Sequence, residues 1–180
     1  MRNCKLFFTL GFVAVMSVSA LAQNATATIN VTAELLEGLQ IDPVADLDLG
    51  SFVLLNGSIE GSLTIDPVIG AHTSDGLAVL TDPTLGSFRV LGSDGTVSVS
   101  IDGSVPLTNG GGSDFLFIPA AHSDLHTFTS SGIGADIEGG ATISSGVSEI
   151  ISIGGTLQEI EGTDAAGSYS GAIGITVSYQ

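Results

Sequence analysis

The sequence lacks most of the residues that stabilise or activate small proteins. Its 180 residues include one cysteine, no tryptophan, two tyrosines and three basic side chains. Without clustered Lys or Arg the chain is a poor partner for nucleic acid, and an anionic membrane surface is disfavoured for the same reason. So few aromatic rings indicate no carbohydrate-binding cleft. We predict that the protein is not an enzyme and uses no cofactor.

Residues 1–22 have the pattern of a signal peptide rather than of a folded element. A basic start, an apolar run over residues 6–18 and small residues before Gln23 are typical of a secretory signal with its cleavage site. A membrane anchor is the weaker alternative because the apolar run is short. We therefore expect export, with no stable membrane insertion after cleavage.

Cleavage of the signal changes the composition of the chain that folds. It removes Cys4, so no disulfide can form even in an oxidising compartment. Arg89 is then the only basic side chain against nineteen acidic ones. This charge favours solubility and mutual repulsion between molecules, but it does not identify a ligand.

Short apolar runs between regular turn signals predict an all-β sandwich or barrel. Asn-Gly, Asp-Gly and Gly-Gly turns recur roughly every eight to twelve residues, and no stretch keeps the apolar period of a helix. We expect Pro43 to interrupt the first strands, and the strands before and after residues 92–95 to pair as a hairpin. Strands are predicted at residues 39–42, 46–55, 63–67, 77–80, 87–91, 96–101, 114–118, 127–129, 135–143, 149–157 and 167–180.

The last fourteen residues alternate between two faces of a strand. The opposite face is small and polar, and the apolar face is shared by Tyr169, Ile173, Ile175, Val177 and Tyr179. This pattern is typical of a strand that buries one face in a sandwich. Gly167, fourteen places from the end, and the penultimate tyrosine resemble the C-terminal signature of chaperone–usher pilins. A ring so close to the chain end is expected to add little to the core.

The predicted mature chain also begins with an alternating strand, within an N-terminal β extension of residues 23–38. The apolar face of this strand continues from Ala25 through Ala27, Ile29, Val31, Ala33 and Leu35. Such a strand can pair within its own domain, or it can act as a donor strand that adds to the sheet of a neighbouring subunit. The sequence favours neither of these, and residues 37–38 would form the hinge.

A set of motifs in a fixed order carries a wider family resemblance. The motifs are Leu47-Asp-Leu-Gly-Ser-Phe, Gly86-Ser-Phe-Arg-Val-Leu-Gly, Val97-Ser-Val-Ser-Ile, Leu107-Thr-Asn-Gly-Gly-Gly, Ile153-Gly-Gly-Thr-Leu and the closing stretch from Ala166 to Tyr179. Over residues 39–180 the chain resembles secreted bacterial proteins of the domain of unknown function 4402 family. These are similar to spore-coat-U-type proteins and, more distantly, to archaic chaperone–usher pilins. The resemblance implies an immunoglobulin-like antiparallel β-sandwich with a surface or fimbrial role.

Few residues could carry chemistry. His122 and His126 stand four apart, but no Glu lies between them as in a zinc protease helix, and a polar loop with two exposed histidines is expected. Asp42, Asp46 and Asp48 alternate near one turn and are weak calcium candidates, because carboxylate oxygens suit that ion. Solvated acids that protect strand edges from aggregation are the favoured interpretation.

These observations predict a structural subunit of a bacterial surface filament, pilus- or fimbria-like, or an adhesive surface protein. Its expected partners are copies of itself or related subunits, with a periplasmic chaperone and usher implied by the pilin resemblance. It would pass through the periplasm to the cell surface or the medium. The alternative is a self-contained monomeric binding module that does not polymerise. A secreted hydrolase is a third interpretation, supported only by scattered acidic residues.

Overall fold

The computed structural model describes residues 32, 38–55, 60–111, 114–144 and 149–180. The predicted signal peptide and the donor-strand residues Ala27, Ile29, Val31, Ala33 and Leu35 lie outside this part of the chain. Within it no helix is long and apolar enough to cross a membrane. Its regular structure consists of the strands β1 (Gln40–Ala45), β2 (Ser51–Leu54), β3 (Glu60–Ile65), β4 (His72–Asp75), β5 (Leu77–Thr81), β6 (Gly86–Leu91), β7 (Gly95–Ile101), β8 (Val105–Thr108), β9 (Asp114–His122), β10 (Thr127–Ser130), β11 (Ile137–Ile143), β12 (Glu149–Glu161) and β13 (Ile175–Tyr179).

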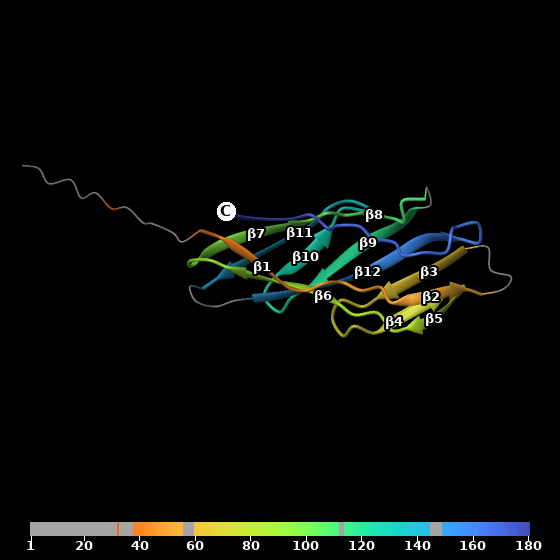
Figure 1. Ribbon diagram of the computed structural model, residues 1–180. Coiled ribbons are helices and arrows are strands. Elements are labelled where there is room, and N and C mark those ends of the chain that lie inside the picture. Colours follow the sequence, from red (N-terminus) through yellow and green to blue (C-terminus); the bar gives the residue numbers. More distant parts are fainter. Residues whose placement is uncertain (1–31, 33–37, 56–59, 112–113, 145–148) are drawn as a thin grey trace, which may run out of the picture. The chain divides into compact units, whose positions relative to one another are not determined.

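The largest sheet is arranged around β12 (Figure 1). Along one edge β12 pairs with β9, which in turn pairs with β8. Along its other edge the first part of β12 pairs with β6 and the last part with β3. The outermost strands beyond these are β1 and β4. One thirteen-residue strand therefore joins both halves of the sheet.

Two smaller sheets pack against this one. The first has the order β10-β11-β7-β13, and the second consists of β2 and β5. All strand pairs in the described part of the chain are antiparallel. The predicted all-β antiparallel sandwich is confirmed.

Alternating side chains build the core in two clusters. Strands β3, β7, β9 and β12 bury every second residue over most of their length, as strands covered on one face must. The first core cluster consists of Leu63, Ile65, Leu77, Val105, Leu107, Phe115, Phe117, Leu157 and Ile160. The second core cluster consists of Phe88, Val90, Val97, Val99, Ile101, Ile137, Ile143, Ile151 and Ile153.

The predicted hairpin between β6 and β7 is wrong. β6 pairs with β1 and β12, whereas β7 pairs with β11 and β13 in the other sheet. Phe88 and Val90 of β6 share the second core cluster with Val97 and Val99 of β7. The two strands therefore face each other across the core, because each has an apolar face that is buried only by stacking.

Three further strand predictions need correction. Pro43 lies inside β1 rather than interrupting it, because an edge strand tolerates a residue without an N–H on its free side. A register shift follows between Pro43 and Ala45. Strands β4 and β8 were not predicted, because β4 is polar and β8 contains Pro106.

Candidate functional site

A long apolar groove opens between the first and the last strands of the domain. Its volume is about 1240 Å³, and it is lined by β1, β2 and their connection, by residues 165–173 and by Ile175. Core side chains also line it, among them Phe88, Val105, Phe117, Ile153 and Leu157. These core side chains are at most 4% exposed, so they form the floor of the groove beneath partly exposed residues such as Phe52, Tyr169 and Ile173.

Two sheet edges flank this groove without a neighbour. Among the described strands, β1 pairs only with β6, and β13 pairs only with β7. The carbonyl of Gly174 accepts a hydrogen bond from the N–H of Asp102, the residue after β7. The N–H of Gln180 donates to the carbonyl of Thr96 in β7. Because N–H and C=O groups alternate in direction along a strand, those of Ile175 and Val177 point away from β7.

Aromatic rings close one part of the groove. The ring of Phe115 stacks on Tyr169 with centroids 3.9 Å apart, and Phe52 lies 6.3 Å from Phe115. The Tyr169 hydroxyl donates to the carbonyl of Ala165 at 2.7 Å. These contacts hold a segment that otherwise has little regular structure against the first core cluster.

The C-terminal strand is shorter than predicted. Only residues 175–179 form β13, and the stretch before it makes a single β-bridge, between Ser170 and Thr108. A Cβ at Gly171 would lie 2.6 Å from the carbonyl oxygen of Pro106, so glycine allows this segment to approach β8. β13 begins only at Ile175 because Ile101, its pairing partner, is the last residue of β7.

The six predicted C-terminal residues divide between the groove and the core. Gly167, Tyr169, Ile173 and Ile175 line the groove. The apolar alternation is confirmed, since Ile173, Ile175, Val177 and Tyr179 pack against the second core cluster. Gly167 is exposed, with open space around its Cα, so the structure gives no packing reason for a glycine there.

The expectation that Tyr179 adds little to the core is wrong. Its ring packs partly buried against the second core cluster. Its hydroxyl accepts a hydrogen bond from the N–H of Ser93 at 2.7 Å, and Gly92 leaves the space that this hydroxyl occupies. The side chain therefore ties the end of the chain to the connection between β6 and β7.

Two variants of Tyr179 should distinguish the contribution of its ring to stability from that of its hydroxyl. Tyr179→Phe is expected to lower the free energy of unfolding by about 1 kcal/mol, because the bond from Ser93 is lost. Tyr179→Ala is expected to lower it by about 2–3 kcal/mol, since the ring contacts are lost as well. Urea unfolding followed by circular dichroism measures both. An alanine variant as stable as the wild type would contradict the anchoring role.

A comparison with family models identifies residues 39–179 as a Domain of unknown function (DUF4402). The chain belongs to the DUF4402 family. No curated protein and no solved structure matches it. The further similarity to spore-coat-U-type proteins and archaic pilins stays a sequence-based prediction.

The calcium candidates of this DUF4402 domain make local contacts. Asp42 accepts a hydrogen bond from the Gln40 side chain at 2.6 Å, and Asp48 accepts one from the N–H of Gly50 at 2.9 Å. Asp46 is exposed and lines the groove. Within the described residues no three His, Cys, Asp or Glu side chains are grouped so that they could hold a metal ion.

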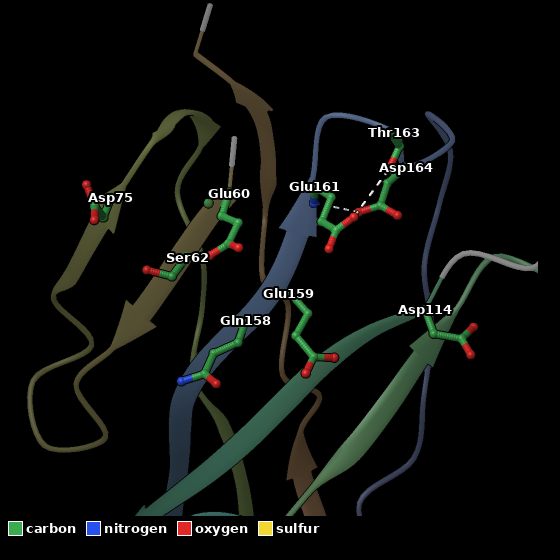
Figure 2. Close-up of a pocket in the computed structure, with 10 residues that line it drawn as sticks. Glu60, Ser62, Asp75, Asp114, Gln158, Glu159, Glu161, Thr163 and Asp164 are labelled. Atoms are coloured by element: carbon green, nitrogen blue, oxygen red, sulfur yellow. Dashed lines mark hydrogen bonds between the residues drawn. The ribbon is translucent and has the colours of Figure 1, made fainter. Parts of the chain in front are cut away.

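A second cavity, of about 820 Å³, is acidic (Figure 2). Its carboxylates come from β3, β4, β9, β12 and the turn after β12, and Figure 2 shows Glu60 on β3, Glu159 on β12 and Asp114 at the start of β9. Glu159 has a φ of 62°, at the register shift where β12 pairs with β3. Hydrogen bonds within the turn engage Glu161 and Asp164. These acidic side chains give the domain a strongly negative surface region.

A buried polar cluster was missed by sequence reasoning. Glu149 is 5% exposed and lies opposite Val90, on the core-facing side of β12. Its carboxylate accepts hydrogen bonds from the Ser123 hydroxyl and from the N–H groups of Leu125 and His126, and it contacts His126 Nδ1. The prediction of two exposed histidines is therefore wrong for His126, which is 4% exposed.

This cluster does not have the geometry of a hydrolase triad. The Ser123 hydroxyl donates to Glu149 and accepts the N–H of His126 at 2.9 Å. His126 Nε2, the atom that would activate a serine, is buried with no hydrogen-bond partner among the described residues. The His126 ring instead stacks on the ring of Phe128, with the two ring centroids 5.8 Å apart. The arrangement ties the connection after β9 to the start of β12.

Proposed function

We propose that this DUF4402 domain is a structural subunit of a bacterial surface filament, or an adhesive surface protein, assembled by β-strand addition. The groove would accept an extended strand from a neighbouring subunit, and residues 25–35 of another copy are the segment that fits best. The observation that supports this is the groove itself, which has partly exposed apolar side chains such as Phe52, Tyr169 and Ile173. It lies between β1 and β13, each of which has one neighbour among the described strands. A strand laid there gains backbone hydrogen bonds and buries apolar side chains.

The chemistry of segment 25–35 matches that of the groove. One face of the segment carries only Ala, Ile, Val and Leu side chains, and the groove offers Phe, Leu, Ile and Val. The only charged residue of the segment, Glu34, falls on its other face. Eleven extended residues span roughly 36 Å at about 3.3 Å each, so the segment can follow a long groove.

Export, a chaperone and an usher belong to this proposal through the pilin resemblance. A periplasmic chaperone would cover the groove before subunits join, and an usher would receive the subunit at the outer membrane. Genes for both beside this one would support filament assembly. A chain that stays monomeric at all concentrations would favour the self-contained binding module.

A labelled peptide of residues 23–37 tests the groove directly. We expect it to bind the exported full chain, with binding followed by fluorescence anisotropy at high dilution of the chain. The peptide variant Ile29→Ala should bind about 30-fold more weakly, corresponding to about 2 kcal/mol for a buried isoleucine.

The matched control is Thr28→Ala, on the opposite face of the same peptide, which should bind like the parent. An equal loss of affinity for both peptide variants would mean that the peptide associates without using its apolar face. No binding of the parent peptide would refute strand addition by this segment.

A further inference from the structure

One wall of the groove is a segment with few hydrogen bonds to the rest of the domain. Residues 166–173, which we call the strap, line the groove just before β13. Six of these eight residues are exposed, and only Tyr169 and Ile173 have side chains larger than serine. Within the described domain, the backbone hydrogen bonds from the strap to other strands are the two that Ser170 and Thr108 exchange, at 2.9 and 3.0 Å. The strap therefore depends for its position mainly on its two large side chains.

Pro106 limits how far the strap can pair with β8. Thr108 directs both its N–H and its C=O at Ser170, so the backbone of Pro106, two residues earlier, faces the same side. Because proline has no N–H to donate, the pairing stays a single β-bridge. The chain is anchored again at Gly174, which donates to the Asp102 side chain at 2.7 Å and accepts the Asp102 N–H at 3.0 Å. The strap is thus the weakly paired stretch before an anchored one.

The strap covers core side chains of β8 and β9. The Tyr169 ring stacks on Phe115, and a Cβ at Gly171 would lie 2.7 Å from the Leu107 side chain and 2.9 Å from that of Val105. Phe115, Leu107 and Val105 are at most 9% exposed. Exposing apolar surface to water raises the free energy in proportion to its area, so the strap is expected to stay closed while the groove is empty.

An incoming strand with an apolar face would supply the same cover. Segments with few buried contacts and exposed backbone open at a low free energy, without unfolding of the rest of the domain. A partner that binds only the open state takes up its place in proportion to the population of that state. The grip of the strap would then set how fast the groove accepts a strand.

Building on the proposed function, we infer that residues 166–173 are a displaceable strap that regulates access to the groove. In the closed position they shield Val105, Leu107 and Phe115. When they lift, this part of the groove opens to the strand of a neighbouring subunit, whose apolar side chains replace Tyr169 over the core.

A disulfide across the β-bridge tests this by locking the strap. Thr108 and Ser170 are exposed and directly opposite each other, and such a hydrogen-bonded antiparallel pair has its Cα atoms about 5.5 Å apart, within disulfide range. Thr108→Cys with Ser170→Cys is made in the exported full chain, with Cys4→Ala so that no other cysteine is present. We expect the labelled 23–37 peptide to associate about tenfold more slowly with the oxidised form, and reduction to restore the rate.

The matched control is a disulfide that leaves the strap alone. Ser98 and Ser178 are paired between β7 and β13. The variant Ser98→Cys with Ser178→Cys should take up the peptide at the same rate in its oxidised and reduced forms. Stopped-flow anisotropy measures the rates for both cysteine pairs.

Two glycine variants test the strap in the opposite direction. Gly171→Ala places a Cβ 2.6 Å from the carbonyl oxygen of Pro106, so it should lift the strap and speed peptide association about fivefold, the effect of weakening one hydrogen bond. Gly167→Ala is the matched control, because nothing lies within 4 Å of its Cβ, and neither glycine has a positive φ. Without any peptide, hydrogen exchange of the backbone N–H at position 170 should be faster in Gly171→Ala and slower in the oxidised disulfide.

The outcomes separate this inference from the proposed function. Peptide uptake by the oxidised strap disulfide as fast as by its reduced form overturns the inference while the proposed function stands. Unchanged or slower uptake by Gly171→Ala overturns it as well, and that variant decides if a free-thiol assay shows that the disulfide does not form. A wild type that does not bind the peptide refutes the proposed function, and with it the role of the strap in strand uptake.

Discussion

Glu149→Ala is expected to lower the free energy of unfolding by about 3–5 kcal/mol, because several buried polar groups lose a partner at once. The substitution leaves His126 buried without the carboxylate that contacts it. It also removes one of the two acceptors of the N–H groups of Leu125 and His126, the other being the Ser123 hydroxyl oxygen. Urea unfolding at fixed pH and salt, followed by circular dichroism, measures the loss.

Two control variants test whether the loss of stability comes from removing a buried carboxylate. Glu60→Ala removes an exposed carboxylate at the start of β3 and should change stability by no more than about 0.5 kcal/mol. Glu149→Gln keeps an acceptor for the N–H groups and should fall between the wild type and the alanine variant. If Glu149→Ala were as mild as Glu60→Ala, the buried carboxylate would not hold the connection after β9 in place.

Leu157→Ala is expected to lower the free energy of unfolding by about 2–5 kcal/mol, the range for a fully buried leucine. Leu157 is 0% exposed, pairs with Phe117 across β12 and β9, and lines the groove. Its truncation should also weaken binding of the 23–37 peptide indirectly, because the buried floor of the groove loses packing.

Leu80→Ala is the matched control for this prediction. Leu80 is 70% exposed on β5, and the same atoms removed there should cost no more than about 0.5 kcal/mol. Chemical unfolding and peptide binding are measured on both variants. A Leu157→Ala chain with normal stability and normal peptide affinity would contradict both the packing and the groove.

Local alternation was a reliable guide to the strands. Thr96 to Ile101 and the residues before Tyr179 alternate in sequence, and both are strands that turn their apolar residues to the core. The polar strand β4 gave no such signal, because neither of its faces is apolar. β8 was hidden by Pro106, which sits at an exposed position of an edge strand.

The candidate site was predicted in part. The C-terminal residues were identified, and Tyr169, Ile173 and Ile175 do line the groove. Residues that complete it, such as Phe52 and Phe115, come from distant strands and could not be grouped from the sequence. Nothing in the sequence grouped Ser123, His126 and Glu149, because their contacts join the connection after β9 to the start of β12.

The sequence by itself determined that the chain is all-β, where most strands lie and which of their faces is apolar. These properties depend on the alternation of apolar and polar side chains at residues two apart, which the sequence shows directly. Only the tertiary structure decided that β6 and β7 stack instead of pairing and that Glu149 contacts His126. It also decided that β1 and β13, each with one neighbour among the described strands, lie beside a groove. Such contacts depend on which strands become neighbours in space, and that choice is made by burying all the apolar faces at once.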